Sequence, residues 1–323
     1  LLITSAADPA AGWVQMVSGA HCWLVGNWPR SCQEEVLGSD PQTLVPGVLA
    51  PQGRATRAGG GWMLNGRWQF ASGVDHGDWL MFGAVADENP EGSPDPLVHL
   101  IVPKSDVTVD DTWFTLGLRG TGSKDLIADD VFVPDHRAMA TRLLFEGSSP
   151  HGEDHATLFN RVPLVTCLAT QLAAAVVGMA SDALALHVER TSERDDMYTG
   201  RRKSESATAQ TRIAESAVEL DAATALVRGA ADRCDRVGAT GERLSNAERA
   251  RSKWHATYAV ELARRATDRI FAASGAHGIY DTAALQARYR DVNTACHHAM
   301  ADVDGTAEMY GRTLLGVPGT SIL

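Results

Sequence analysis

Three successive patterns of hydrophobic and polar residues divide this chain. Residues 10–37 are interrupted by Pro29 and carry apolar positions at the spacing of one helical face, including Trp13, Met16, Val17 and Ala20. Between residue 42 and about residue 134, short apolar or alternating segments are separated by Gly, Pro, Asp and Asn. This second pattern is typical of strands joined by turns, and it predicts strands at residues 79–86, 97–103 and 126–134.

Long helices are predicted in the second half of the chain. Residues 163–190 are rich in Ala and apolar almost all round, as expected for the central helix of a bundle. The next helix has an apolar stripe with one polar member: Ile213, Ala217, Leu220, Thr224 and Val227. A third helix begins with a capping box at Ser245 and Glu248, and a last helix runs from about residue 282 to residue 300. These four helices predict an antiparallel bundle.

The composition narrows the classes of function. The net charge of −11 at pH 7 argues against nucleic acid partners, because neutralising phosphates requires clustered Lys and Arg. The 5 cysteines are scattered without a C-x-x-C pair, as expected for reduced thiols in the cytoplasm rather than disulfides or a zinc site. The apolar run at residues 164–179 is too short and too interrupted to span a bilayer. We therefore expect a cytoplasmic protein that has no metal site and binds neither nucleic acid nor a membrane.

Several nucleotide and hydrolase motifs are missing from the sequence. No G-x-G-x-x-G follows a predicted strand and opens a helix, and neither a P-loop nor a G-x-S-x-G elbow is found. Without a nicotinamide site of the Rossmann type, a redox enzyme with this sequence requires electrons delivered from outside.

The segment that begins at Trp62 carries the first positive signal. It reads W-M-L-N-G-R-W-Q-F-A-S-G-V-D-H-G-D-W, a predicted strand with aromatic residues that ends at Ser72 and Gly73. Phe70 offers a flat apolar wall, Ser72 a hydroxyl at its edge, and Gly73 lets a planar ligand approach the backbone. Taken alone, the same residues are also explained by a strand end with a turn serine.

A second block, G-L-R-G-T-G-S-K-D-L-I-A-D-D-V-F-V-P-D-H-R, predicts a Gly-rich loop followed by a strand. The order and spacing of the two blocks resemble the central β-domain of the acyl-CoA dehydrogenase fold. More narrowly, they resemble the oxygenase components of two-component flavin-dependent aromatic hydroxylases. The resemblance implies an α+β fold with N-terminal helices that are partial in this chain, a central antiparallel β-barrel and a C-terminal four-helix bundle. The corresponding domains are residues 1–40, 41–140 and 141–323.

The resemblance also assigns candidate residues around a flavin. Ser72 is expected near the flavin N5, with Phe70, Gly73 and Trp113 flanking the isoalloxazine. His298 is expected over the flavin C4a region as the catalytic residue, since relatives carry a His at this distance beyond the Ser-Gly corner. Helical spacing places Asp291 on the face of His298, where a carboxylate could fix its tautomer and tune its pKa.

Further candidates concern the substrate and the flavin phosphate. The resemblance places His21 against the phenolic oxygen of the substrate, with Trp13 and Gly47 lining the substrate pocket. Arg190 and Arg194 are candidates for the flavin phosphate, with an ordinary charged surface as the alternative. His277 stands in a loop that relatives place against the flavin. The backbone N–H groups of residues 120–123 could bind an anion or a neighbouring subunit.

The resemblance implies the activity of an oxygenase that uses reduced FMN or FAD, with FMN favoured, delivered by a separate flavin reductase. The expected reaction uses O₂ through a C4a-hydroperoxyflavin to hydroxylate a phenolic or polycyclic aromatic substrate, in a homotetramer. An N- or S-oxygenase on the same scaffold is one alternative. An acyl-CoA dehydrogenase is another, because Asp304 in V-D-G-T-A-E-M stands where many dehydrogenases carry a catalytic Glu. A non-catalytic scaffold of this fold is a third.

Overall fold

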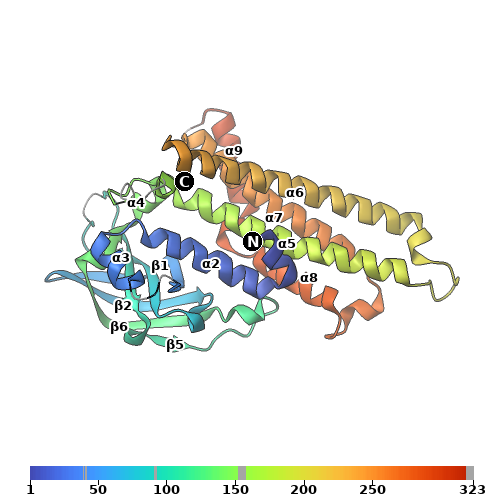
Figure 1. Ribbon diagram of the computed structural model, residues 1–323, viewed down its shortest axis with the longest axis horizontal. Coiled ribbons are helices and arrows are strands. Elements are labelled where there is room, and N and C mark those ends of the chain that lie inside the picture. The colour runs from blue at the N-terminus through green and yellow to red at the C-terminus, as the bar shows by residue number, and fades with distance from the viewer. Residues whose placement is uncertain (39, 41, 91–92, 152–157, 318–323) are drawn as a thin grey trace.

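A computed structural model describes residues 1–38, 40, 42–90, 93–151 and 158–317 of the chain. Three helices come first, as the apolar pattern and its break at Pro29 predict: α1 (Leu2–Ala7), α2 (Pro9–Val25) and α3 (Arg30–Leu37) (Figure 1). α2 already ends at Val25, with Gly26 as its C-cap, and Pro29 stands directly before α3 as its N-cap. Asp8 caps α2 by accepting a hydrogen bond from the Ala11 N–H at 2.9 Å.

The middle of the chain forms one sheet. Its strands are β1 (Gly47–Ala58), β2 (Gly61–Ala71), β3 (Trp79–Ala86), β4 (Leu97–Pro103), β5 (Thr108–Asp110), β6 (Lys124–Pro134) and β7 (Ala138–Ala140). The three strands predicted from the sequence are confirmed as β3, β4 and the larger part of β6. The hydrogen-bonded order is β5-β6-β2-β1-β3-β4-β7.

The expectation of an antiparallel barrel is wrong in two respects. The order of the described strands is linear and has two ends, β5 and β7, so the sheet is open. β1 and β3 pair in parallel, whereas the other pairs are antiparallel. The physical reason is the path of the chain. β2 returns antiparallel to β1 on one edge, and the chain then crosses through residues 74–76 to the other edge of β1, where β3 runs in the direction of β1.

The helices of the C-terminal half are α4 (Thr141–Glu146), α5 (Leu164–Glu193), α6 (Ala207–Thr240), α7 (Asn246–Ala272), α8 (Ala284–Ala295) and α9 (Val303–Leu314). The capping box at Ser245 and Glu248 is confirmed at the start of α7. Among the described helices, α5 is the one long and apolar enough to cross a membrane, yet 78% of its most apolar window is buried within the protein. The helix is the core of the bundle, against which α6, α7 and α8 pack (Figure 1).

The last predicted helix ends earlier than expected. α8 stops at Ala295, because the next N–H groups bond three residues back: His297 to Thr294 and His298 to Ala295. His298 itself has extended backbone angles and caps the short helical turn that follows it, its ring accepting from the Met300 N–H at 3.1 Å. The prediction that His298 lies within a helix, on one face with Asp291, is therefore wrong.

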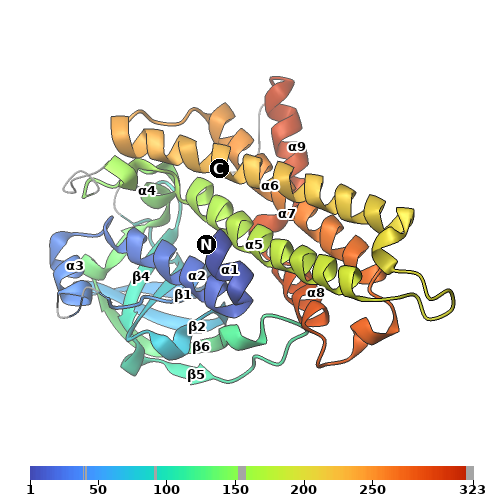
Figure 2. The same cartoon turned by 45° about the vertical axis from the view of Figure 1, so that its right-hand side comes forward.

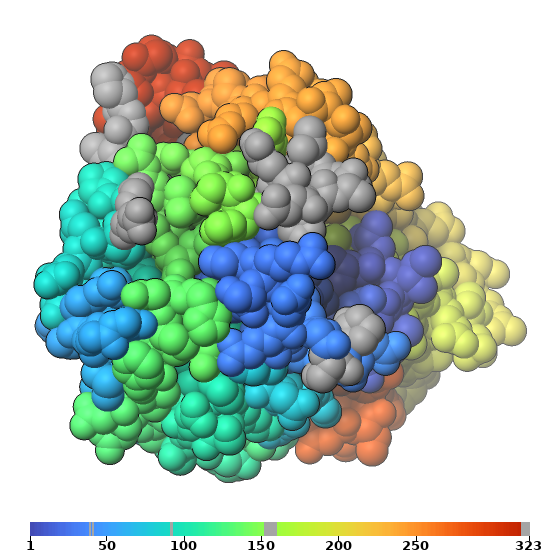
Figure 3. Space-filling view, turned by 60° about the vertical axis from the view of Figure 1, so that its left-hand side comes forward, coloured from blue at the N-terminus to red at the C-terminus, as the bar shows by residue number. Residues whose placement is uncertain are grey.

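The N-terminal helices lie between the sheet and the bundle (Figures 1 and 2). α2 packs on α5, and α1 packs against both α2 and α5. The space-filling view in Figure 3 shows the same arrangement, with the N-terminal helices in blue between the sheet in cyan and green and the bundle in orange. Residues of α2 therefore reach both the end of β2 and the C-terminal bundle.

The sheet is tightly packed around Trp68, which is fully buried. Its indole N–H donates to the Gly83 carbonyl at 2.6 Å, and its ring meets Phe82 edge-on with centroids 4.8 Å apart. Gly53 lies directly against this ring, since a Cβ added there would stand 2.0 Å from Trp68 Cζ2.

Gly53→Ala should therefore lower the free energy of unfolding by about 1–3 kcal/mol, because the new methyl group overpacks the ring. Gly19→Ala is the matched control: it lies on the exposed side of α2 with open space around it, and should stabilise by about 0.5–1 kcal/mol. Urea denaturation followed by tryptophan fluorescence measures both. Equal stability of the two variants would contradict this description of the sheet core.

Candidate active site

An aromatic corner stands at the end of β2. Phe70 has φ of 74°, in the left-handed region that a non-glycine residue rarely adopts, at an irregularity in the pairing of β2 with β6. Phe70 is 62% exposed, and its ring meets Trp113 edge-on with centroids 6.2 Å apart. A strained backbone that holds an apolar ring in solvent is the type of feature that binding sites retain.

Ser72 and Gly73 follow directly on this corner and are buried. Gly73 has φ of 76°, and its N–H donates to the Thr121 carbonyl at 2.9 Å. The Ser72 hydroxyl accepts from the Trp13 indole N–H at 3.1 Å and lies 2.7 Å from the Ser123 hydroxyl. The strand end is thus joined to α2 on one side and to the Gly-rich loop on the other.

The loop from Trp113 to Ser123 is organised around the peptide groups of Leu118. Its carbonyl accepts from Trp113 Nε1 at 2.9 Å and from Thr121 Oγ1 at 2.8 Å. Its N–H donates to Asp291 Oδ1 at 2.6 Å, which joins the loop to α8. Leu118 itself has φ of 51°, so the loop is held in a conformation that an isolated chain would seldom adopt.

Asp291 was expected to orient His298, but in the structure its carboxylate binds the Leu118 N–H instead. Burial raises the pKa of the Asp291 carboxyl, and the hydrogen bond from the Leu118 N–H lowers it. Gly117 confirms how closely the loop approaches α8, since a Cβ there would stand 2.3 Å from the Arg290 carbonyl oxygen. Asp291 therefore acts on the position of the loop.

His298 lies beside Trp13, with ring centroids 5.7 Å apart and an angle of 66° between the planes. His298 is an exposed residue of the chain, yet loss of hydration around its ring, together with the nearby charge of Lys253, lowers its pKa to about 4. The ring is therefore neutral at physiological pH. Because Nδ1 accepts from the Met300 N–H, the proton sits on Nε2, which is a hydrogen-bond donor.

Lys253 is a residue that sequence reasoning missed. It lies on the buried side of α7, and its ammonium group donates to the Met300 carbonyl, which also accepts from Thr257 Oγ1 at 3.2 Å. Burial lowers the pKa of Lys253 to about 8. The signal in the sequence was a lysine at helical spacing from Val260, in the row of α7 positions that face the core. Lys253 fixes the turn in which His298 stands.

His21 is fully enclosed between α2 and the start of β1. Its Nδ1 lies 3.0 Å from the Val45 carbonyl, so this nitrogen carries the proton and Nε2 is an acceptor in the neutral ring. Burial lowers the pKa of His21 to about 4. Gly47 follows two residues later, with no room for a Cβ against the Met81 backbone. Its place in the sheet already accounts for a glycine, and its contact with a substrate stays a prediction.

Three predicted cofactor residues lie apart from this group within one chain. Arg190 and Arg194 stand at the C-terminal end of α5, and His277 stands in the turn Ala276–Ile279 that follows α7. That turn precedes α8, whereas His298 follows it, so the 12 residues of α8 separate them by about 18 Å. The structure brings together Trp13, Phe70, Ser72, Gly73, Trp113 and His298.

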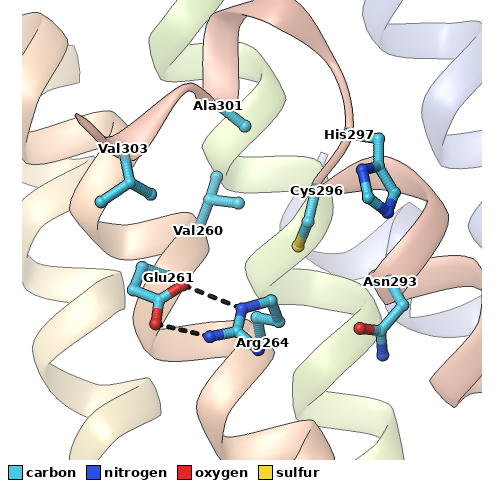
Figure 4. Close-up of a pocket in the computed structure, with 8 residues that line it drawn as sticks. All are labelled: Val260, Glu261, Arg264, Asn293, Cys296, His297, Ala301 and Val303. Carbon is cyan, nitrogen blue, oxygen red and sulfur yellow. Dashed lines mark hydrogen bonds and ion pairs between the residues drawn. The ribbon is translucent and has the colours of Figure 1, made fainter. Parts of the chain in front are cut away.

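The neighbouring His297 faces elsewhere. It lines a cavity of about 350 Å³ between α7 and α8 that also contains Asn293, Cys296 and the ion pair of Glu261 with Arg264 (Figure 4). The two consecutive histidines thus lie in different environments: His297 lines the cavity, and His298 contacts Trp13 near Ser72.

The chain as a whole is similar to known flavoproteins. The family model described as acyl-CoA dehydrogenase, C-terminal domain, matches residues 170–303. The chain is 34% identical to the FADH(2)-dependent resorcinol hydroxylase, oxygenase component, of Rhizobium sp. strain MTP-10005, covering 97% of this chain and 78% of that protein. It is 31% identical to the flavin-dependent monooxygenase, oxygenase subunit HsaA, of Mycobacterium tuberculosis, over 96% of this chain and 78% of the relative.

The chain belongs to the oxygenase subunits of flavin-dependent monooxygenases with the acyl-CoA dehydrogenase fold. The crystal structure of 3-HSA hydroxylase from Rhodococcus sp. RHA1 superimposes with a TM-score of 0.92 at 30% identity, covering 99% of this chain and 82% of that one. The predicted α+β fold and the predicted flavin-dependent monooxygenase are thereby confirmed. In this monooxygenase, the fold, with an open mixed sheet, brings Trp13, Ser72 and His298 to one place.

The buried histidines of this monooxygenase predict its pH-dependent stability. His99, fully buried in β4 and bonded to Thr141 Oγ1 at 2.8 Å, has its pKa lowered to about 4 by burial and by the nearby His21. A histidine with a lowered folded pKa takes up a proton in the unfolded chain first. Stability is therefore complete above pH 6.5 and falls as the pH drops from 6.5 toward 4.

We expect each such histidine to remove about 2 kcal/mol of unfolding free energy between pH 6.5 and pH 5. The variant His99→Asn cannot titrate and should lose correspondingly less stability over this interval than the parent. Urea denaturation at the two pH values measures the difference. The same loss in parent and variant would show that His99 is not held neutral.

Proposed function

We propose that this monooxygenase hydroxylates a phenolic or similarly electron-rich aromatic substrate, with reduced flavin bound against Phe70, Ser72 and Trp113. The observation that carries the proposal is that Trp13 touches both groups assigned to the flavin. Its indole N–H bonds to Ser72, and its ring meets His298. A flavin edge placed beside Ser72 is therefore also within the surroundings of His298.

The described residues fit a flavin. The isoalloxazine is planar and apolar on its faces, and the exposed ring of Phe70 set edge-on to Trp113 offers a matching wall. Trp113 is held by its own hydrogen bond to the Leu118 carbonyl, so this wall is rigid. When bound, reduced flavin supplies the activation of O₂ and the electrons for transfer of one oxygen atom.

His298 acts as a neutral hydrogen-bond donor. The low pKa keeps the ring neutral across the physiological range, and the Met300 N–H bound at Nδ1 places the single ring proton on Nε2. A donor of this kind stabilises an oxygen atom that carries developing negative charge without giving up its proton. Lys253 contributes by holding the Met300 carbonyl and with it the turn.

His21 acts as a hydrogen-bond acceptor toward the substrate. Its Nδ1–H is bound to the Val45 carbonyl, which leaves Nε2 to accept a hydrogen bond from the hydroxyl of a phenol. Polarising that O–H bond increases the electron density of the ring carbon ortho to the oxygen. This pairing favours a phenol over a sulfide, which has no O–H or N–H group, and over an amine, whose N–H is a much weaker hydrogen-bond donor than a phenol O–H. The N- or S-oxygenase is the second choice for this reason.

The acyl-CoA dehydrogenase alternative depends on Asp304. This residue lies exposed in the first turn of α9, and the described hydrogen bonds and ion pairs place no part of the Ser72 corner against it. A carboxylate base must stand within hydrogen-bond reach of the proton that it removes. The relatives at 31% and 34% identity are a monooxygenase and a hydroxylase, which further supports the oxygenase.

The electrons are proposed to come from a separate flavin reductase, by diffusion of the reduced flavin, in the cytoplasm. Reduced FMN is the first candidate from the family resemblance, whereas the name of the resorcinol hydroxylase specifies FADH₂ for that relative, so the experiments use both flavins. A homotetramer is supported by the remote positions of Arg190, Arg194 and His277. These residues can act on a flavin phosphate if a second subunit brings the end of its bundle to the site.

The test admits O₂ to the protein mixed anaerobically with reduced flavin, in the presence of phenolic substrates, and measures both hydroxylated product and hydrogen peroxide. His298→Ala should lower product formation by about 100-fold and release peroxide instead, because one preorganised donor is removed. Flavin binding should survive.

His297→Ala is the matched control, since this neighbour faces the other cavity. It should keep the ratio of product to peroxide of the parent. Full coupling in the His298 variant would overturn the role of His298, and failure of the parent to react with any phenol while oxidising amines or sulfides would overturn the substrate class.

A further inference from the structure

Three buried hydroxyl groups form a continuous chain behind the flavin corner. Ser72 Oγ lies 2.7 Å from Ser123 Oγ, which lies 2.6 Å from Thr121 Oγ1. Trp13 Nε1 stands at one end, 3.1 Å from Ser72, and the Leu118 carbonyl at the other, 2.8 Å from Thr121. The three hydroxyl residues are between 2% and 6% exposed, so water does not compete for these bonds.

The two ends fix the direction of every proton in the chain. An indole N–H can only donate, and a carbonyl oxygen can only accept. Thr121 must therefore give its single proton to Leu118, so it accepts from Ser123. Ser123 has then used its own proton, so it accepts from Ser72. Only this direction makes all four hydrogen bonds at once; reversing any hydroxyl leaves two acceptors facing each other in a buried site.

We propose that Thr121 and Ser123 are positioning residues that make Ser72 a pure hydrogen-bond acceptor toward the flavin and thereby select its reduced form. Ser72 has one proton, committed to Ser123, and one lone pair filled by Trp13. The remaining lone pair can accept but cannot donate. The inference builds on the proposed placement of the flavin N5 beside Ser72.

The two redox states of a flavin differ at this atom. Reduced flavin carries an N5–H and donates, whereas oxidised flavin presents an N5 lone pair and accepts. Ser72 Oγ therefore accepts a hydrogen bond from the N5–H of reduced flavin. In oxidised flavin, two acceptors, Ser72 Oγ and N5, would face each other, which lowers the affinity in a buried site. An oxygenase that takes up reduced flavin and releases oxidised flavin benefits from this difference at both steps.

The test measures the dissociation constants of oxidised and of anaerobically reduced flavin for the same preparation. Ser123→Ala frees the proton of Ser72, which can then turn toward oxidised N5. Thr121→Val removes the acceptor of the Ser123 proton. Ser123 then donates to Ser72, and the Ser72 proton is again free to turn toward oxidised N5. Both variants should lose about tenfold of the preference for reduced flavin, mainly through tighter binding of the oxidised form.

Two controls separate this effect from general damage. Thr121→Ser keeps the hydroxyl and should keep the preference of the parent. Trp13→Phe removes the bond at the other end but leaves the proton of Ser72 committed, so it also retains the preference, whatever happens to its activity. Unfolded protein reduces the number of sites for both flavins alike and does not change the ratio of their constants.

The midpoint potential of the bound flavin gives an independent readout. Tighter binding of the reduced form raises this potential above that of free flavin, so Ser123→Ala and Thr121→Val should lower it by about 30 mV for a tenfold loss. The inference alone would be overturned if the parent prefers reduced flavin but Ser123→Ala and Thr121→Val leave the ratio of the two dissociation constants unchanged. An equal loss of the preference in Thr121→Ser would overturn it too. A parent that binds neither flavin would overturn the proposed function as well.

Discussion

The peptide groups of Leu118 hold the candidate site together. The N–H is bound by Asp291, 173 residues away on α8, and the carbonyl is bound by Trp113 and Thr121. The sheet supplies the aromatic wall and Ser72, while the bundle supplies His298. These parts meet correctly only while the loop stays docked on α8. A hydrogen bond to a charged group contributes about 1.5–3 kcal/mol, enough to keep a strained loop in one conformation.

The site is also organised by where protons are held. Burial lowers the pKa of His21 to about 4, and loss of hydration together with the charge of Lys253 lowers the pKa of His298 to about 4, so both rings are neutral. Backbone partners choose opposite tautomers for them. Nδ1 donates in His21 and accepts in His298. Together with the directed hydroxyl chain, this gives each group facing the cofactor or substrate a fixed role as donor or acceptor. The fold therefore supplies a preorganised polar environment, and the flavin supplies the redox chemistry.

Local patterns in the sequence correctly predicted the features that depend on interactions between residues close in sequence. Helical periodicity, the break at Pro29, the capping box at Ser245 and alternation in the strands all gave the right elements. The Ser72 corner was found because the extended motif around it resembles that of the flavin-dependent hydroxylases, since the strand end taken alone also fits a turn serine. The predictions that were wrong concern contacts between residues far apart in the sequence. The parallel pair of β1 and β3 follows from a crossover, and Asp291 serves a loop far away in sequence. α8 ends before His298 because the N–H groups of His297 and His298 bond three residues back, and the His298 ring then caps the following turn. The hydroxyls of Thr121 and Ser123 looked like turn residues because nothing local reveals their partners.

The central claim is the place of the flavin, and a crystal structure of the anaerobically reduced complex tests it most directly. We predict the isoalloxazine against Phe70 and Trp113, with N5 at about 3 Å from Ser72 Oγ and the adjacent ring edge toward His298. A flavin bound in the cavity beside His297, or with N5 remote from Ser72, would contradict the account.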